Sequence, residues 1–403
     1  METPIATTPA AGLSGTPGGA RDYLIDIPQV LYAVVFASTC IVVGLIWDIS
    51  WHRSIGRDTF WTPAHLLEQA AALIAGLSCG WLALQTSFAG TAEARAQSVT
   101  FWRYFQAPLG AWVCIWGTIM MITSAPFDNW WHNAYGLDVK IISPPHMILA
   151  FGMFAIQIGA LLMAVSAQNR AGADDSRKYA MIYAYAAGVL LVMRATVIQE
   201  YASVANEMHH AGFYEITGAV FPIGLFGLAR AGRLKWPATT MAALYTGIVL
   251  MMLWILELSP ATPKLAPIYN PITHMVPPPF PLLLIVPAFI GDLIMRSFGR
   301  GRDWTLSVIL GAMFVLVMLI VHWFWADFML TPHARNFGFG ADKWDYGTRL
   351  GPWRYEFWNL DRNAAGHWSV GLFARRMVFA TVFAILSTRV GLVIGDAISR
   401  VRR

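Results

Sequence analysis

Two stretches of the sequence place aspartate and histidine at spacings that suit a metal site. In the first, WDISWHRSIGRDTFWTPAHLLEQ (residues 47–69), Asp48 and His52 are four residues apart, so both project from one face of a helix. Pro63 is typical of the first turn of a second helix, which puts His65 near the start of that helix. Only about ten residues connect the two helices, so one carboxylate and two imidazoles can converge on one point.

The second stretch, FDNWWHNAYGLDVKIISPPHMIL (residues 127–149), repeats this order of residues. Asp128 and His132 restore the pair four residues apart, and His146 again follows a proline by two positions. The remaining matches are Gly136, Asp138 and Pro144 with Gly56, Asp58 and Pro63, and the second copy is one residue longer. A single histidine at a helix end is more often an interfacial residue than a ligand. The joint pattern, occurring twice, favours metal binding.

Two imidazoles and one carboxylate suit zinc, non-haem iron or copper and leave coordination positions open. Open positions favour chemistry over a purely structural clip. Neighbouring polar side chains are candidates to orient the ligands: Arg57, Asp58, Glu68 and Asp138. Bis-histidine haem is an alternative, because His52 and His65 are 13 residues apart. That alternative needs one continuous helix, which Pro63 and the charged residues before it interrupt.

The elements that must position these residues are membrane-spanning helices. Of the 403 residues, 57% are hydrophobic and 13% are charged, whereas soluble domains carry roughly 25% charged residues. Apolar runs of about 20 residues can cross a bilayer core of roughly 30 Å. We identify ten: 29–50, 63–88, 108–129, 144–167, 178–200, 210–230, 237–258, 276–297, 305–328 and 375–398. We therefore expect an all-α, polytopic integral membrane protein with about ten transmembrane helices.

The connections between the spans predict an orientation. Arginine and lysine gather on one side, which the positive-inside rule makes cytoplasmic together with both termini. All ten histidines fall at or near the other side, so the candidate metal sites face the extracytoplasmic side of a cell inner membrane. The basic residues are scattered in short clusters, so we expect no nucleic-acid partner.

The chain divides into three parts. Residues 1–28 form a Pro/Gly-rich tail that we expect to be disordered, and residues 29–167 form a four-helix part with both candidate sites. Residues 168–403 add about six spans and a tryptophan-rich segment, 329–374, expected to lie along the interface. Acids and histidines recur in this half without fixed spacing, and we interpret them as interfacial residues or the lining of a polar cavity. Arg194, inside a span, predicts a pairing with an acid such as Glu200.

The first stretch closely resembles a signature of the C-type subunit in the copper membrane monooxygenases, the methane and ammonia monooxygenase family. That signature reads Asp-x3-His, Arg-Asp-Thr and Thr-Pro-x-His-x-x-Glu, and the resemblance implies copper on Asp48, His52 and His65. The family's second metal position, Asn-x3-His with a histidine 14 residues later, is similar to Asp128, His132 and His146. Asp128 replaces the usual Asn, and its added charge would admit zinc or iron beside copper. The resemblance covers roughly residues 29–167.

The resemblance implies a membrane-embedded, copper-dependent monooxygenase in which both ligand sets are catalytic. The substrate would be small and apolar or weakly polar, such as a short hydrocarbon or ammonia, oxidised with dioxygen. Other membrane subunits and an electron donor are implied as partners, beside membrane lipid. Two alternatives stay open: a metal- or proton-coupled transporter, and a non-catalytic metal-binding subunit of a membrane complex. The transporter would need polar residues through the full bilayer depth, and the cytoplasmic half has few.

Overall fold

The computed structural model describes most of the chain. The described residues are 27–56, 59–136, 142–202, 208–264, 273–278, 280, 282–298, 301–329, 331–334, 336–339 and 361–402, with the backbone alone described at 27, 199–202 and 282. Most of the expected tail 1–28 and half of the expected interfacial segment 329–374 lie outside these residues, although residues 27 and 28 already belong to the first helix.

Nine helices within the described residues are long and apolar enough to cross a membrane. They are α1 (Ile27–Ser54), α2 (Pro63–Phe88), α4 (Leu109–Tyr135), α5 (Pro144–Arg170), α6 (Ser176–Ala202), α7 (Ala211–Ala231), α8 (Pro237–Leu258), α10 (Asp303–Met329) and α12 (Val370–Ile398). Proline occupies the first turn of α2, α5 and α8, where its missing N–H costs no helical hydrogen bond. The chain is therefore an all-α, multi-pass membrane protein whose helices contact lipid.

The span expected at 276–297 has a different form. Residues 275–278 are not helical, and the helix begins with the 3-10 turn η1 (Leu282–Leu284) and continues as α9 (Ile285–Ser297). Pro277 and Pro278 have no N–H to donate and so prevent a helix at this point, which hydropathy alone does not register. With 13 residues, α9 is about 20 Å long and too short to cross the bilayer core.

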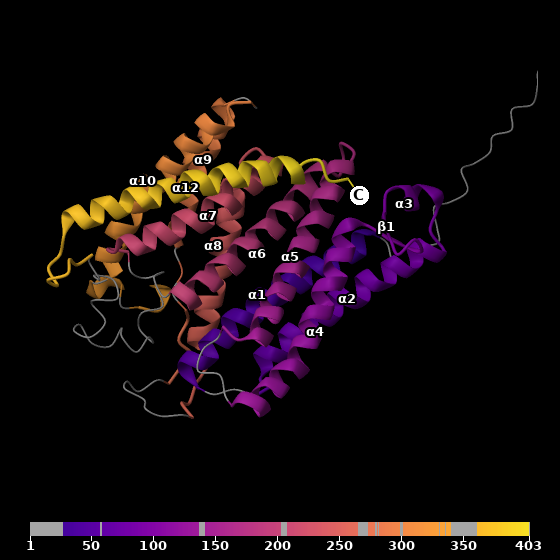
Figure 1. Cartoon of the computed structure of the whole chain (residues 1–403), viewed down its shortest axis with the longest axis horizontal. Coiled ribbons are helices and arrows are strands. Elements are labelled where there is room, and N and C mark those ends of the chain that lie inside the picture. Colours follow the sequence, from indigo (N-terminus) through magenta and orange to yellow (C-terminus); the bar gives the residue numbers. More distant parts are fainter. Residues whose placement is uncertain are drawn as a thin grey trace, which may run out of the picture.

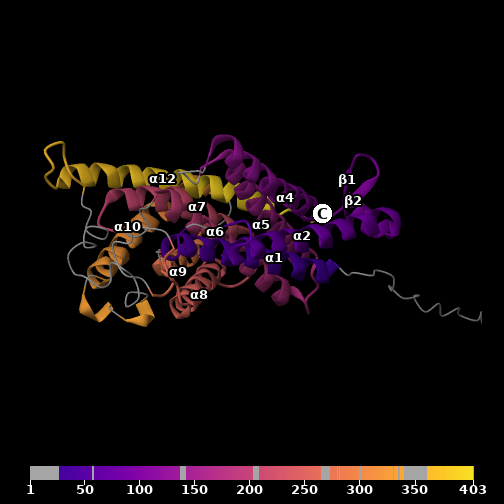
Figure 2. The same cartoon turned by 90° about the horizontal axis from the view of Figure 1, so that it is seen from below.

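The long helices form two groups around one hydrophobic core. In the first group, α1, α2, α4 and α5 pack against one another (Figure 1). In the second, α12 lies along α7 on the opposite side of the molecule, as both views show (Figures 1 and 2). Helices α6 and α8 lie between the two groups. The α1–α2 and α4–α5 connections, which carry the candidate ligands, lie at the same end of the first group because α2 and α4 are antiparallel neighbours.

A small β-hairpin, which the sequence analysis does not predict, joins α2 to α4. It follows the short helix α3 (Ala92–Ala96) and pairs β1 (Val99–Phe101) with β2 (Phe105–Ala107), with Phe101 opposite Phe105. Two turn residues, Trp102 and Arg103, have positive φ values of 48° and 68°. The remaining short elements are the 3-10 turns η2 (Pro332–Ala334) and η3 (Phe337–Phe339).

Candidate metal centre

The first candidate site gathers one carboxylate and two imidazoles at the α1–α2 connection. The Nε2 atom of His65 lies 3.1 Å from Oδ1 of Asp48, and the Nε2 atom of His52 lies 3.7 Å from Oδ2. Helix α1 continues to Ser54, which keeps Asp48 and His52 one turn apart on the same face. The structure therefore brings together the three side chains that the sequence predicts for this site.

A backbone carbonyl fixes the orientation of His65. Its Nδ1 atom lies 3.0 Å from the carbonyl oxygen of Thr59, in the turn that Thr62 closes by donating its N–H to the same oxygen. Because a carbonyl only accepts, Nδ1 carries the ring hydrogen, and Nε2 of the neutral ring directs a lone pair at Asp48. Oδ1 of Asp48 is buried and accepts no hydrogen bond from any described residue. Two electron-rich atoms thus face each other, which requires a cation or an added proton between them.

The second candidate site repeats this arrangement at the α4–α5 connection. The Nε2 atoms of His132 and His146 lie 3.3 Å and 3.5 Å from the two carboxylate oxygens of Asp128. Here the oriented ring is that of His132, whose Nδ1 lies 3.2 Å from the carbonyl oxygen of Gly136. Gly136, with φ of 87°, ends α4 in a conformation that glycine adopts readily. Oδ1 of Asp128 is also buried without a hydrogen bond from the described residues.

The two sites differ in how open they are. The side chain of Asp48 is 16% exposed, whereas that of Asp128 is 31% exposed. Contacts from the second half of the chain cover only the first of these two connections among the described residues. There, Ser54 Oγ accepts the N–H of Val276, and the carbonyl of Ile55 accepts the N–H of Lys264. The segment between α8 and η1 thus braces the end of α1 beside the first site.

The donor set fits a transition metal. Ligand atoms bound about 2.0–2.2 Å from one ion at tetrahedral angles are roughly 3.3 Å apart. The four nitrogen–oxygen distances in the two sites lie on either side of that value, from 3.1 Å to 3.7 Å. No group of three or more His, Cys, Asp or Glu side chains in the described residues is arranged to hold a metal ion as it stands. Each imidazole nitrogen therefore lies about as far from its carboxylate oxygen as two ligands of one metal ion would. The three side chains of a set, however, do not all converge on one point.

The connection does not provide the geometry that bis-histidine haem would need. Helix α1 ends at Ser54 and α2 begins at Pro63, so His52 and His65 belong to separate helices. Both rings point toward one carboxylate instead of toward opposite faces of a planar group.

The predicted supporting residues are only partly described. Arg57, Asp58 and Asp138 lie outside the described residues. Glu68 is buried in α2 and packs against α1 at Gly44, one turn before Asp48, where an added Cβ would be 2.6 Å from its Cγ. Its carboxyl group therefore lies deeper in the bundle than the candidate ligands.

A further polar cluster, which the sequence analysis does not predict, joins α7 to α12. Asp361 accepts hydrogen bonds from Arg376 and from the N–H of Ala211 at the start of α7, and it lies 3.3 Å from Nε2 of His210. Arg376 also pairs with Glu215. Nearby, Nε2 of His209 lies 3.2 Å from Asp327. Asp361 already has an arginine and a backbone donor as partners, so this cluster is a hydrogen-bonded structural network.

Arg194 has a backbone partner among the described residues. Its guanidinium donates to the main-chain carbonyl of Val220 on α7, at 3.3 Å. The side chain of Glu200, the acid proposed to pair with it, lies outside the described residues.

Comparison with known proteins gives no match: no protein-family model, no curated protein and no solved structure matches the chain. The fold and the candidate sites define an all-α, multi-pass membrane protein with two Asp–His–His sets at one end of its helices.

Proposed function

We propose that this protein is a membrane-embedded, copper-dependent monooxygenase that resembles the C-type subunit of the methane and ammonia monooxygenases. The observation that carries the proposal is a buried carboxylate oxygen that accepts no hydrogen bond from the described residues and lies 3.1 Å or 3.5 Å from an imidazole Nε2 atom, in two separate connections. A bound cation would satisfy both atoms at once. The repeat of the same geometry at two connections supports metal binding over a chance contact between surface residues.

Asp48, His52 and His65 would hold copper at the first site, and Asp128, His132 and His146 would hold copper, zinc or iron at the second. Bound copper would supply the activation of dioxygen for oxidation of a small, apolar or weakly polar substrate, such as a short hydrocarbon or ammonia. The chain's own residues orient the donors: the Thr59 carbonyl holds His65 and the Gly136 carbonyl holds His132. The more open second site gives readier access from outside the bundle.

The proposal includes a setting and partners. The sites would face the extracytoplasmic side of a cell inner membrane, because the basic connections lie at the opposite ends of the helices. Other membrane subunits and an electron donor would complete the enzyme, since the oxidation needs electrons that no described residue supplies.

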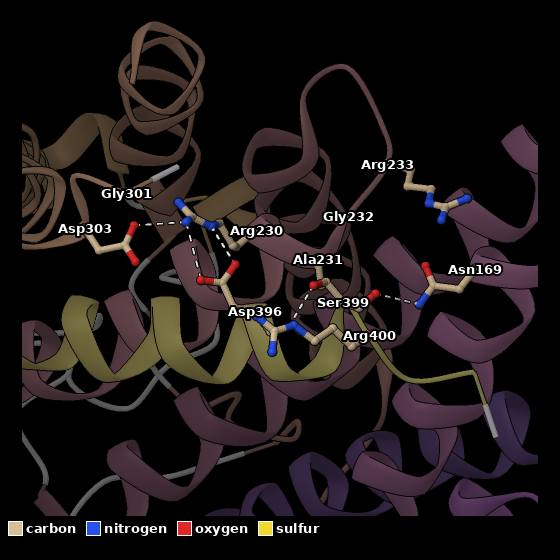
Figure 3. A pocket seen from close by; sticks show the side chains of 10 residues that line it. All are labelled: Asn169, Arg230, Ala231, Gly232, Arg233, Gly301, Asp303, Asp396, Ser399 and Arg400. Carbon is tan, nitrogen blue, oxygen red and sulfur yellow. Dashed lines mark hydrogen bonds and ion pairs between the residues drawn. The ribbon is translucent and has the colours of Figure 1, made fainter. Parts of the chain in front are cut away.

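One observation favours the alternative of a coupled transporter. A polar cavity of about 480 Å³ opens at the end of the bundle opposite the candidate sites (Figure 3). Arg230 lines this cavity and donates hydrogen bonds to Asp303 and Asp396. These bonds link the ends of α7, α10 and α12. Polar groups thus occur at both ends of the second helix group, and an ion path would also need them at the depths between. The non-catalytic alternative, a subunit that binds metal only to hold a complex together, shares the same candidate sites.

Metal analysis of the purified full chain tests the proposal. We expect copper in the wild-type protein, a loss of part of it in His52→Ala and in His132→Ala, and no loss in His333→Ala, an exposed histidine outside both sites. Equal metal content in all four proteins would contradict it. Protein reconstituted in vesicles separates the alternatives, because a transporter moves metal or protons across the bilayer whereas a monooxygenase consumes dioxygen when supplied with substrate and reductant.

A further inference from the structure

An apolar surface groove runs between α2 and α4 at the end of these helices away from the candidate metal sites. The two helices touch at Gly76, where an added Cβ would collide with the side chain of Thr118, and the hydroxyl of Thr118 donates to the Ala72 carbonyl. One turn further along α2, a Cβ at Gly80 would have nothing within 4 Å. Gly80 therefore lies on the open face of the groove, beside the line along which α2 and α4 pack.

The β-hairpin lines this groove beside the end of α2 and the start of α4. Phe101 packs against Trp112 and Trp116 of α4, with ring centroids 5.2 Å and 5.8 Å apart, and Trp112 donates its indole N–H to the Val99 carbonyl. The hairpin thus contacts α4 through Phe101, while β2 packs against α2. The space enclosed between α2, α4 and the hairpin is about 560 Å³ and is lined almost entirely by apolar and aromatic side chains. That volume lies in the range, about 300–1,000 Å³, of pockets that hold small-molecule ligands.

The groove opens on a surface that faces lipid. Leu77 and Phe88 on α2 are 72% and 69% exposed, and Trp116 on α4 is 46% exposed. Apolar side chains with this exposure, on helices long enough to span a bilayer, are in contact with acyl chains. A hollow in such a surface is filled by the same chains, because water gains no hydrogen bonds there.

The residues at the hairpin tip favour one charge of lipid. Trp102, which lines the groove, and Arg103 follow each other in the turn of the hairpin with positive φ values, which are unfavourable for side chains with a Cβ. Arg103 and Arg95 are the basic residues between α2 and α4, against a single acid, Glu93. Arginines at the level of the headgroups attract anionic lipid.

We propose that this groove binds one anionic phospholipid, with an acyl chain between α2 and α4 and the phosphate headgroup at Arg103. The site is at the far end of α2 from Asp48 and His65, so it does not rest on the proposed metal chemistry. Gly80 leaves room for the chain, the aromatic rings of Phe101, Trp112 and Trp116 line it, and Arg103 selects the headgroup.

Photo-crosslinking tests the site with the full chain in phosphatidylcholine vesicles. A trace of phosphatidylglycerol or of phosphatidylcholine, each with a diazirine on one acyl chain, is activated, and the labelled peptides are mapped. We expect the phosphatidylglycerol probe to label residues 76–84 and 112–119 about fivefold more than the phosphatidylcholine probe, the preference that one basic residue gives. Gly80→Leu should fill the groove and reduce this labelling. Arg103→Gln should reduce labelling by the phosphatidylglycerol probe to the level given by the phosphatidylcholine probe.

Gly247→Leu on α8 is the matched control, because an added Cβ at Gly247, as at Gly80, has nothing within 4 Å. It should leave labelling of the groove unchanged, and elution as a single species on gel filtration confirms that each variant is folded. Equal labelling by the two probes in the wild type would overturn the preference for anionic lipid. Labelling that Gly80→Leu does not reduce would overturn the site itself.

Discussion

Asp48 and Asp128 each face an imidazole nitrogen whose protonation is set by a backbone carbonyl. Because the Thr59 and Gly136 carbonyls take the Nδ1 hydrogens, the Nε2 atoms can pair with a carboxylate only through a metal ion or a second ring proton. Either cation would balance a carboxylate that the end of an apolar helix leaves partly desolvated. Metal and proton differ in one testable respect, since a chelator removes a bound metal ion but not a proton.

The first prediction concerns that charge. Asp48→Asn keeps the shape of the side chain but removes the charge and one donor oxygen. We expect metal affinity at the first site to fall by more than the roughly 10–100-fold that losing a hydrogen-bonding partner of a ligand costs. Glu68→Gln, deeper in the bundle, should have a smaller effect. Metal titration of the purified protein measures both, and full metal content in Asp48→Asn would show that the set is not a metal site.

The second prediction concerns the α7–α12 cluster. Asp361 is 1% exposed and holds Arg376, the N–H of Ala211 and, more loosely, His210. Asp361→Ala leaves the arginine charge without its buried partner, which costs about 3 kcal/mol of the free energy of unfolding. Thermal unfolding in detergent should show a lower midpoint, whereas Asp174→Ala, an exposed acid in the connection after α5, should leave it unchanged. An equal midpoint for both variants would show that the cluster contributes nothing to stability.

At the scale of the helix and its connection, local pattern determined what could be predicted. The gathering of the two Asp–His–His sets was predictable because residues four apart share a helix face and because Pro63 and Pro144 mark helix starts. The hydrogen bond that braces the first site was not predictable, because Val276 and Ser54 are 222 residues apart in the sequence. Asp361 and Arg376 were missed for the same reason, because their partners on α7 are 150 and 161 residues away. Nothing in the local sequence of any of these residues indicates its partner.

The third prediction tests the close packing of α12 on α7. An added Cβ at Gly395 would collide with the carbonyl oxygen of Gly227, so the two helices approach to backbone contact. Gly395→Ala should separate them and lower the free energy of unfolding by about 1–3 kcal/mol. Gly371→Ala, in the same helix, meets no atom within 4 Å and should be neutral or slightly stabilising. If the two substitutions shift the unfolding midpoint alike, the close packing does not limit stability.

At the scale of the whole molecule, composition was sufficient to predict an all-α membrane protein, and the structure supplies nine long helices among the described residues. What composition could not give is the grouping of these helices. Both candidate sites belong to α1, α2, α4 and α5, whereas the charged network belongs to the second group and the polar cavity is lined mainly by its residues, with Asn169 of α5 at the edge. The molecule therefore separates its two candidate ligand sets from its main ion pairs, and the membrane orientation decides which compartment each one faces.

The last prediction tests that orientation. Trp61 and Ile142, in the α1–α2 and α4–α5 connections, are 72% and 62% exposed, and Ala173 is exposed between α5 and α6. The native cysteines are buried and free, so a cysteine introduced at each position can be labelled against a silent background. In intact cells, a membrane-impermeant maleimide should label Trp61→Cys and Ile142→Cys but label Ala173→Cys only after permeabilisation. The reverse labelling pattern would place both candidate sites on the cytoplasmic side of the membrane and so contradict the positive-inside assignment. Different labelling of positions 61 and 142 would separate the two sites and contradict a shared catalytic face.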